Sequence, residues 1–188
     1  KEYWPTVKWI LQYLKGSLNA CLRFGSGKPL LEGFTDSDMS VDVDTNRSTS
    51  WYVMTYAGGV VSWQSRLQNS VALSTTKAEY MEVVEAGKEV IWMKDFIGEL
   101  GIQQDAFRLY YDSQSAIHLA KNAAYHSRTN HILRRYHWLR EKVEEKDFVL
   151  TKIHTEEKGS DMLTKVLSTN KLDVCRRRIR LTKNPMSE

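Results

Sequence analysis

The chain has 188 residues, of which 41% are hydrophobic and 27% are charged, the balance of one ordinary globular domain with its own core. No apolar run approaches the roughly 20 residues that cross a bilayer, so a transmembrane helix is excluded and we expect no membrane partner. The net charge of +4 is unevenly distributed, because Lys and Arg cluster at 128–142 and at 176–180. Such basic patches favour a polyanionic partner.

The cysteines and the first residue bear on the origin of the chain. Cys21 and Cys175 lie far apart in the sequence and match no zinc spacing. Their scarcity favours a reducing compartment, so we expect an intracellular protein of the cytoplasm or nucleus. Because the sequence begins at Lys1 rather than Met, we expect it to be a piece of a longer polypeptide.

The first third of the chain predicts one helix followed by short strands. Residues 4–16 have the pattern of an amphipathic helix, with Pro5 in the first turn and Gly16 at the end. The dipeptide Gly58-Gly59 predicts a hairpin. The extended segments expected around it lie at 20–24, 30–36, 49–57 and 60–64.

A long helix opens the remaining two thirds of the chain. Apolar residues recur at helical spacing from 75 to 100, and Gly101 supplies a C-terminal stop. Strands and helices alternate from there on, which predicts an α/β fold with helices packed on a mixed sheet. The expected elements are strands at 107–111 and 148–154 and helices at 113–121, 127–145, 160–167 and about 169–180, with residues 182–188 disordered.

Four carboxylates fall at the ends of these expected elements. Asp36 and Asp112 end strands. Glu79 lies in the first turns of the long helix, and Asp161 opens a late short helix. Carboxylate oxygens are ligands that Mg²⁺ prefers, and two such ions about 3.5–4 Å apart can cleave a phosphodiester. Taken singly, each acid has a structural alternative as a helix cap, a first-turn acid or a turn residue.

Eight blocks of sequence, in this order, carry a family resemblance. They are Gly33-Phe34-Thr35-Asp36-Ser37-Asp38, Arg47-Ser48-Thr49-Ser50, Ser62-Trp63-Gln64-Ser65, the stretch 71–80, Asp112-Ser113-Gln114-Ser115-Ala116, the stretch 126–132, the stretch 135–141, and Ser160 to Lys165. The chain thereby resembles, over nearly its whole length, the ribonuclease H domain of the Pol polyprotein of copia-type LTR retrotransposons. The resemblance implies a ribonuclease H-like fold, a five-stranded mixed sheet with three antiparallel strands first, flanked by helices.

The same resemblance implies an endoribonuclease that cuts the RNA strand of an RNA–DNA hybrid. Its catalytic acids would be Asp36, Glu79, Asp112 and Asp161, which would hold two Mg²⁺ ions that Mn²⁺ can replace. The residues matched to contacts with the substrate are Ser74, Thr75 and Thr76 for the backbone and Gln114 for the minor groove. Amides and hydroxyls at a helix start are natural phosphate contacts, and the 2′-OH distinguishes RNA from DNA.

Two further candidates keep open alternatives. His154 stands between the last strand and the final acid, where ribonucleases H often carry a His that helps proton transfer or product release. Alternatively, it is a surface residue at a strand end. Arg128 belongs to a basic helix at 127–142 that either guides the hybrid through phosphate contacts or forms a solvated face. The histidines of this region predict no zinc site, because no Cys or carboxylate completes one.

The resemblance also divides the chain into parts. Residues 1–17 resemble the end of the preceding reverse transcriptase region, which would be a further partner within the same polyprotein. Residues 18–168 form the ribonuclease H-like domain, which we expect to be monomeric, and residues 169–188 a basic C-terminal tail.

Two departures from the family pattern leave a second function open. Met39 stands where Trp is usual, and Trp51 stands where Gly is usual. A Trp in a central strand is expected to strain the packing by about 1–3 kcal/mol unless the core repacks. These changes fit a diverged or host-domesticated copy, and the alternative function is a catalytically weak or inactive module that binds nucleic acid or a protein. An integrase-like transferase is disfavoured, because Glu79 comes second among the four acids rather than last.

Overall fold

The computed structural model of the chain describes residues 3–25, 27–38, 47–68, 71, 75–104, 107–112, 130–153, 162 and 167–184. Among these residues, no helix is long and apolar enough to span a membrane. The elements, in chain order, are α1 (Trp4–Gly16), β1 (Ala20–Leu22), β2 (Leu31–Asp38), β3 (Thr49–Tyr56), β4 (Gly59–Leu67), α2 (Thr75–Glu99), β5 (Arg108–Tyr111), α4 (Asn130–Glu144), β6 (Val149–Lys152), α5 (Thr169–Arg178) and β7 (Leu181–Lys183).

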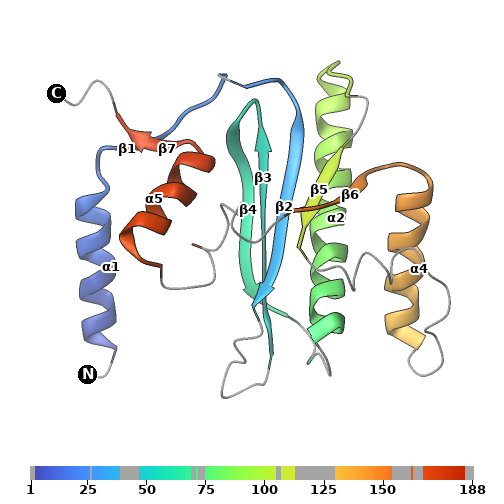
Figure 1. The fold of residues 1–188 in the computed structure, drawn as a ribbon, viewed down its shortest axis with the longest axis horizontal. Coiled ribbons are helices and arrows are strands. Elements are labelled where there is room, and N and C mark those ends of the chain that lie inside the picture. Colours follow the sequence, from blue (N-terminus) through green and yellow to red (C-terminus); the bar gives the residue numbers. More distant parts are fainter. Residues whose placement is uncertain are drawn as a thin grey trace.

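A five-stranded sheet lies at the centre of the described residues, in the order β4-β3-β2-β5-β6. β2, β3 and β4 pair antiparallel, whereas β5 runs parallel to β2 and β6 runs parallel to β5. Helices α2 and α4 lie on one side of this sheet, and α1 and α5 lie on the other (Figure 1). The predicted mixed sheet with three antiparallel strands first is therefore confirmed.

The hairpin between β3 and β4 turns one residue earlier than its glycine pair suggests. Ala57 and Gly58 form the turn, with φ angles of 50° and 78°. This is the left-handed backbone that a two-residue hairpin requires. Gly59 is instead the first residue of β4, where a Cβ would lie 2.5 Å from the Phe24 ring. The second glycine is thus needed for close packing against the segment after β1.

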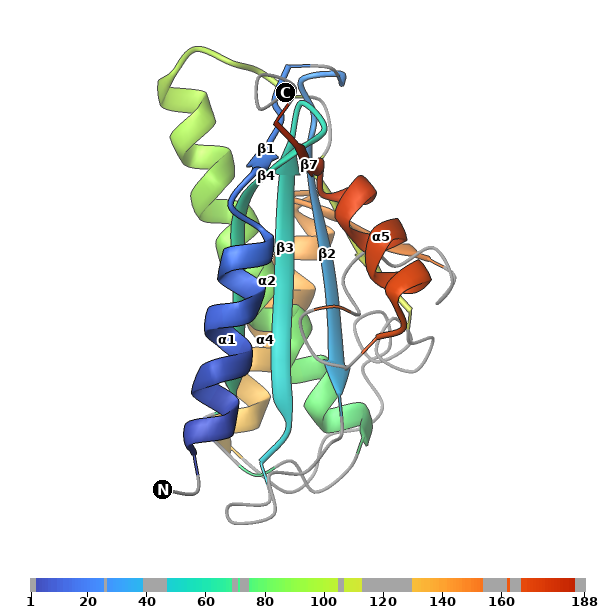
Figure 2. The same cartoon turned by 90° about the vertical axis from the view of Figure 1, so that its left-hand side faces the viewer.

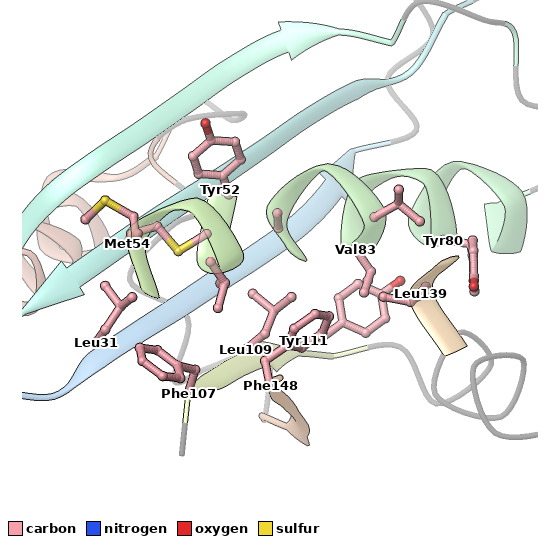
Figure 3. Close-up of a cluster of buried hydrophobic side chains, with 14 of the residues drawn as sticks. Leu31, Tyr52, Met54, Tyr80, Val83, Phe107, Leu109, Tyr111, Leu139 and Phe148 are labelled. Atoms are coloured by element: carbon pink, nitrogen blue, oxygen red, sulfur yellow. The ribbon is translucent and has the colours of Figure 1, made fainter. Parts of the chain in front are cut away.

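The sheet has a hydrophobic core on each face. β3 alternates between the two, because Tyr52 and Met54 face α2 whereas Trp51 and Val53 face α5. The larger core lies between α2, the strands and α4, and Figure 3 shows its side chains gathered along α2. Its fully buried members include Leu109, Leu139 and Phe148.

Trp51 lies on the face of the sheet opposite to α2, where other apolar side chains pack around it. It is 1% exposed and packs in a small cluster with Val53 and Val60. Leu22 of β1 and Ile179, at the end of α5, cover this cluster. The indole Nε1 is buried and has no hydrogen-bond partner in the described part of the chain. The space beside this bulky side chain is therefore filled by residues of β1 and of the end of α5, which lie outside the five-stranded sheet.

The C-terminal region is more ordered than expected. The predicted helix near 169–180 is confirmed as α5, but the expectation of disorder from Thr182 onward is wrong for its first residues. β7 pairs antiparallel with β1, with Cys21 opposite Thr182, and forms a second small sheet. Figure 2 views α1, α5 and this small sheet from their own side of the molecule. The predicted helix at 113–121 and most of that at 160–167 lie outside the described residues.

Candidate active site

The parallel pairing of β2 and β5 brings two of the predicted acids together. Phe34 lies opposite Tyr110 in the register of the two strands. Asp36 and Asp112 each follow two residues later, at the same end of the sheet. The prediction that Asp36 ends its strand is wrong, because β2 continues to Asp38, whereas Asp112 directly follows β5. The carboxyl ends of parallel strands are a common location for active sites.

Glu79 lies at the same end of the sheet, on α2. This helix runs antiparallel to β2, because its early residue Glu82 contacts Thr35 and the rest of α2 then runs back along the sheet (Figure 1). Glu79 is one turn before Glu82 and is half-buried. Figure 1 shows the start of α2 beside the arrowhead of β2.

Glu82 is a residue of the site region that the sequence reasoning missed. It is 1% exposed, and its Oε1 accepts hydrogen bonds from the Thr35 hydroxyl at 2.7 Å and from the Trp51 amide at 3.2 Å. Thr35 directly precedes Asp36, and Trp51 is the residue opposite Asp36 in β3. Glu82 therefore fixes α2 against the two strands beside this acid. The only signal in the sequence was a carboxylate within the apolar run 80–84.

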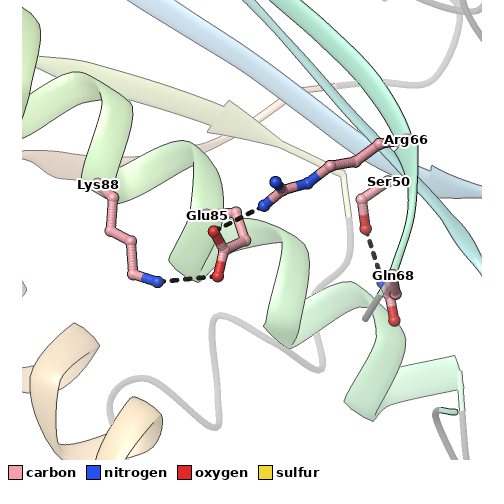
Figure 4. Close-up of polar contacts among 5 residues, drawn as sticks. All are labelled: Ser50, Arg66, Gln68, Glu85 and Lys88. Atoms are coloured by element: carbon pink, nitrogen blue, oxygen red, sulfur yellow. Dashed lines mark hydrogen bonds and ion pairs between the residues drawn. The ribbon is translucent and has the colours of Figure 1, made fainter. Parts of the chain in front are cut away.

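A second buried polar residue holds the first turn of α2. Gln68, which follows β4, donates from Nε2 to Ser50 Oγ at 2.7 Å and to the Ala78 carbonyl at 2.8 Å. Ala78 directly precedes Glu79, so this contact ties the Glu79 backbone to the edge of the sheet. Figure 4 shows the Gln68–Ser50 bond beside a more exposed ion-pair link between β4 and α2, in which Glu85 binds Arg66 and Lys88.

An aromatic pair stands two residues before Asp36 and Asp112. The rings of Phe34 and Tyr110 are stacked, with centroids 5.0 Å apart and planes 14° apart. The Tyr110 hydroxyl donates to Glu32 Oε1 at 2.9 Å. Burial raises the pKa of Tyr110, and Glu32 raises it further, which keeps the phenol protonated as a donor. These contacts hold β2 and β5 in register below Asp36 and Asp112.

Several predicted site residues lie outside the described part of the chain. They are Ser74, Gln114, Arg128, His154 and Asp161, together with the side chains of Asp36 and Thr75. Thr76, in the first turn of α2, is partly buried. Among the described side chains, no group of three or more His, Cys, Asp or Glu is arranged to hold a metal ion. Of the four predicted ligands, that search reaches only Glu79 and Asp112, so the four-acid site stays a prediction.

Comparison with known proteins identifies the relatives of the chain. No family model matches it. The chain is 50% identical over 184 residues to the retrovirus-related Pol polyprotein from transposon TNT 1-94 of Nicotiana tabacum, which covers 98% of the chain and 14% of the polyprotein. It is 32% identical over 188 residues to the corresponding polyprotein from transposon RE2 of Arabidopsis thaliana, covering 99% and 13%. The chain is related to one segment of transposon Pol polyproteins.

Solved structures give the fold of this segment. LC11-RNase H1, isolated from compost, superimposes with a TM-score of 0.53 at 15% identity and covers 72% of this chain and 92% of its own. The same enzyme in complex with an RNA/DNA hybrid gives a TM-score of 0.51 at 14% identity, covering 71% and 92%. The predicted ribonuclease H fold and the predicted Pol relationship are confirmed. The chain spans about one seventh of the length of the tobacco polyprotein.

Proposed function

We propose that this segment is a ribonuclease H that hydrolyses the RNA strand of RNA–DNA hybrids with two bound Mg²⁺ ions, which Mn²⁺ can replace. The observation that carries the proposal is the β2–β5 register, which supports neighbouring positions for Asp36 and Asp112. Glu79 starts its helix at the same end of the sheet. A structural neighbour has been solved with an RNA/DNA hybrid, which supports this substrate class.

The donors available at this end of the sheet fit a divalent cation of the Mg²⁺ type. Asp36, Glu79, Asp112 and Asp161 would hold the ions, because hard cations take carboxylate oxygens and the set offers no sulfur or imidazole ligand. When bound, such a pair of ions activates water and stabilises the leaving oxygen of a phosphodiester. Glu82 and Gln68 position two of these acids by fixing the first turns of α2.

The remaining predicted contacts complete the proposed substrate site. Ser74, Thr75 and Thr76 would bind a backbone phosphate, because the start of α2 presents amide and hydroxyl donors together with the positive end of the helix dipole. Gln114 would bind the minor groove and select RNA through its 2′-OH. His154 would carry a proton or assist product release, and Arg128 would bind phosphate.

The test is cleavage of an end-labelled RNA–DNA hybrid in Mg²⁺ by the wild type and by Glu79→Gln and Asp112→Asn. Mutation of a residue that only hydrogen-bonds to a metal ligand typically lowers metal affinity or activity about 10–100-fold. Each of these substitutions changes a proposed ligand itself, so each is expected to lower the cleavage rate by about 100-fold or more. The matched control is Glu99→Gln, which makes the same change at an exposed position at the far end of α2.

Circular dichroism checks that each variant is folded. Wild-type cleavage that Glu79→Gln leaves unchanged would contradict the assignment of this carboxylate. A wild type that binds the hybrid but leaves it intact in both Mg²⁺ and Mn²⁺ would refute the enzymatic proposal and leave a nucleic-acid-binding module.

A further inference from the structure

One of the two basic clusters of the chain lies at its C-terminal end. We call α5, β7 and the turn between them, residues 169–183, the basic arm. It contains six Lys or Arg residues and one acid, Asp173, and its net charge of +5 exceeds the +4 of the whole chain. The rest of the protein is therefore close to neutral. Charge clustered in this way creates a local potential that attracts polyanions.

A cavity of about 490 Å³ opens between the basic arm and the connection from α1 to β1. Arg176, Arg177 and Lys183 line it, and Ser17, Asn19 and Thr182 add polar groups. Asp173, the one acid of its lining, lies 3.8 Å from Arg176. Three cations against one acid leave a net charge of +2 at the cavity.

Two cations at this cavity are available to an anionic partner. The side chains of Arg177 and Lys183 have no hydrogen bond or ion pair with the described residues, although both line the same space. Thr182 also lines the cavity, but its Oγ1 is buried and does not reach the open space. Arg177 and Lys183 are exposed, so a phosphate in the cavity can reach both of them.

The backbone holds the cavity in shape at some energetic cost. Arg180, in the turn after α5, has a φ of 59°, a left-handed conformation that Gly adopts more readily than other residues. Its guanidinium lies beside Gly58, where a Cβ would be 3.6 Å from Nε. The Arg23 amide donates to the Arg180 carbonyl at 3.1 Å. This tight reversal directs α5 and β7 so that Arg177 and Lys183 border one space.

We propose that this cavity binds a phosphate of a nucleic-acid backbone, which makes the basic arm a second nucleic-acid contact. The arm lies across the sheet from α2 (Figure 2). Gly58, which Arg180 contacts, is at the end of β3 opposite to Trp51, the partner of Asp36. Between these ends β2 has about five residues, roughly 17 Å of strand. A hybrid bound at the cavity would therefore be held at the end of the sheet opposite to the predicted catalytic acids. The identity of the nucleic acid as a hybrid rests on the proposed function, but the binding itself needs no cleavage.

The test is the salt dependence of hybrid binding, measured by fluorescence anisotropy in EDTA so that no cleavage occurs. The arm variant is Arg177→Gln with Lys183→Gln. The matched control is Lys88→Gln with Lys146→Gln, which removes the same charge from exposed positions on α2 and just after α4, across the sheet. Each lost phosphate contact lowers the slope of log K against log salt by about 0.7–0.9. The arm variant is expected to lose about 0.7–0.9 units of slope, for the one phosphate held in the cavity, together with several-fold in affinity at low salt, and the control is expected to keep the wild-type slope.

A third variant, Lys171→Gln with Arg178→Gln, tests the cavity rather than the charge. It removes two charges from exposed positions of the same arm outside the lining of the cavity, and we expect it to lose less slope and less affinity than the arm variant. An equal loss in the two variants would overturn the cavity assignment. An arm variant with the wild-type slope would overturn the second contact altogether. Equal competition by polyglutamate would show an unspecific polyanion surface and also overturn the phosphate site.

The two proposals fail separately. If the wild type cleaves the hybrid but the arm variant keeps the wild-type salt slope, the proposed function stands and the second contact is refuted. A chain that never cleaves but loses slope in the arm variant retains the contact.

Discussion

Glu82 is the residue on which the geometry around Asp36 most depends. Its carboxylate is buried, and it joins α2 to β2 and β3 through hydrogen bonds to Thr35 and Trp51. A hydrogen bond is worth about 0.5–1.5 kcal/mol, and a buried polar group that loses its partner costs about 1–3 kcal/mol. A change at either partner should therefore affect both folding and the position of the neighbouring acid.

We expect Thr35→Val to lower the free energy of unfolding by about 1–3 kcal/mol and to reduce cleavage of the hybrid, because it removes a donor from buried Glu82. Urea denaturation and the rate of cleavage measure the two effects. The control is Thr55→Val in the adjacent strand, where the hydroxyl donates to the neutral Glu32 carbonyl at 3.3 Å. An equal loss of activity in both variants would contradict a positioning role for Glu82.

The sequence predicted the strands that carry two of the acids better than the contacts around these acids. Asp36 lies in β2 and Asp112 directly follows β5, and both of these parallel strands were recognisable from their local pattern. Glu82 and Gln68 could not be predicted, because a polar residue near a helix face or a strand end normally contacts water. Their burial is decided by which strands lie opposite, and that is a property of the tertiary structure. The accommodation of Trp51 by Leu22 and Ile179 is of the same kind.

At the level of elements, Asp147 joins the two helices that cover one face of the sheet. It forms ion pairs with Lys94 of α2 and Lys142 of α4 and precedes the fully buried Phe148. The hydrogen bond from Lys94 holds the pKa of Asp147 below its ordinary value, with a further contribution from Lys142. A carboxyl whose pKa is lowered by folding stabilises the native state wherever it is ionised.

We expect Asp147→Asn to lower the free energy of unfolding by about 1–2 kcal/mol at pH 7 and to flatten its dependence on pH. In the wild type this contribution is complete above the unfolded pKa of about 3.9 and is lost as pH falls through the lower folded pKa. Urea denaturation between pH 7 and pH 2 measures both effects. Glu145→Gln is the control, because Glu145 is 48% exposed and pairs with Lys142 alone among the described residues. A wild-type pH profile in Asp147→Asn would refute the linkage.

Elements with a long local pattern were predictable, and the short ones were not. The apolar spacing of residues 75–100 predicted α2 to within one residue. β7 was missed, because a strand of three residues has no periodicity of its own. It exists through its pairing with β1, about 160 residues earlier in the chain. The helix of the basic arm was expected, whereas its packing onto Trp51 depended on partners that the local sequence does not specify.

At the level of the whole molecule, α1 stands apart from the two cores. It has no buried residue, and exposed apolar side chains such as Trp4, Trp9 and Leu11 cover it. Its contact with the rest of the described chain includes the Arg176 guanidinium, 5.7 Å from the Tyr13 ring centroid. A cation–π contact of this kind is worth about 0.5–1 kcal/mol at an exposed site.

Deletion of residues 1–16 is therefore expected to lower the free energy of unfolding by about 1 kcal/mol or less. Thermal or urea denaturation measures the change. Deletion of residues 169–184 serves as the comparison, because it uncovers Trp51 and Val53 and should cost several kcal/mol. A large loss of stability without α1 would mean that this helix belongs to the folding unit. The predicted boundary after residue 17 would then be wrong.

The pairing of β2 with β5 has a consequence for how the protein is made. The bond from Tyr110 to Glu32 joins residues 78 positions apart. Closing so long a loop is entropically costly and slow compared with forming a helix or a hairpin. During synthesis, β2, β3, β4 and the start of α2 all leave the ribosome before β5 exists. A nascent chain thus carries Asp36 and Glu79 without Asp112, and the proposed site cannot assemble until the second half of the domain has been synthesised.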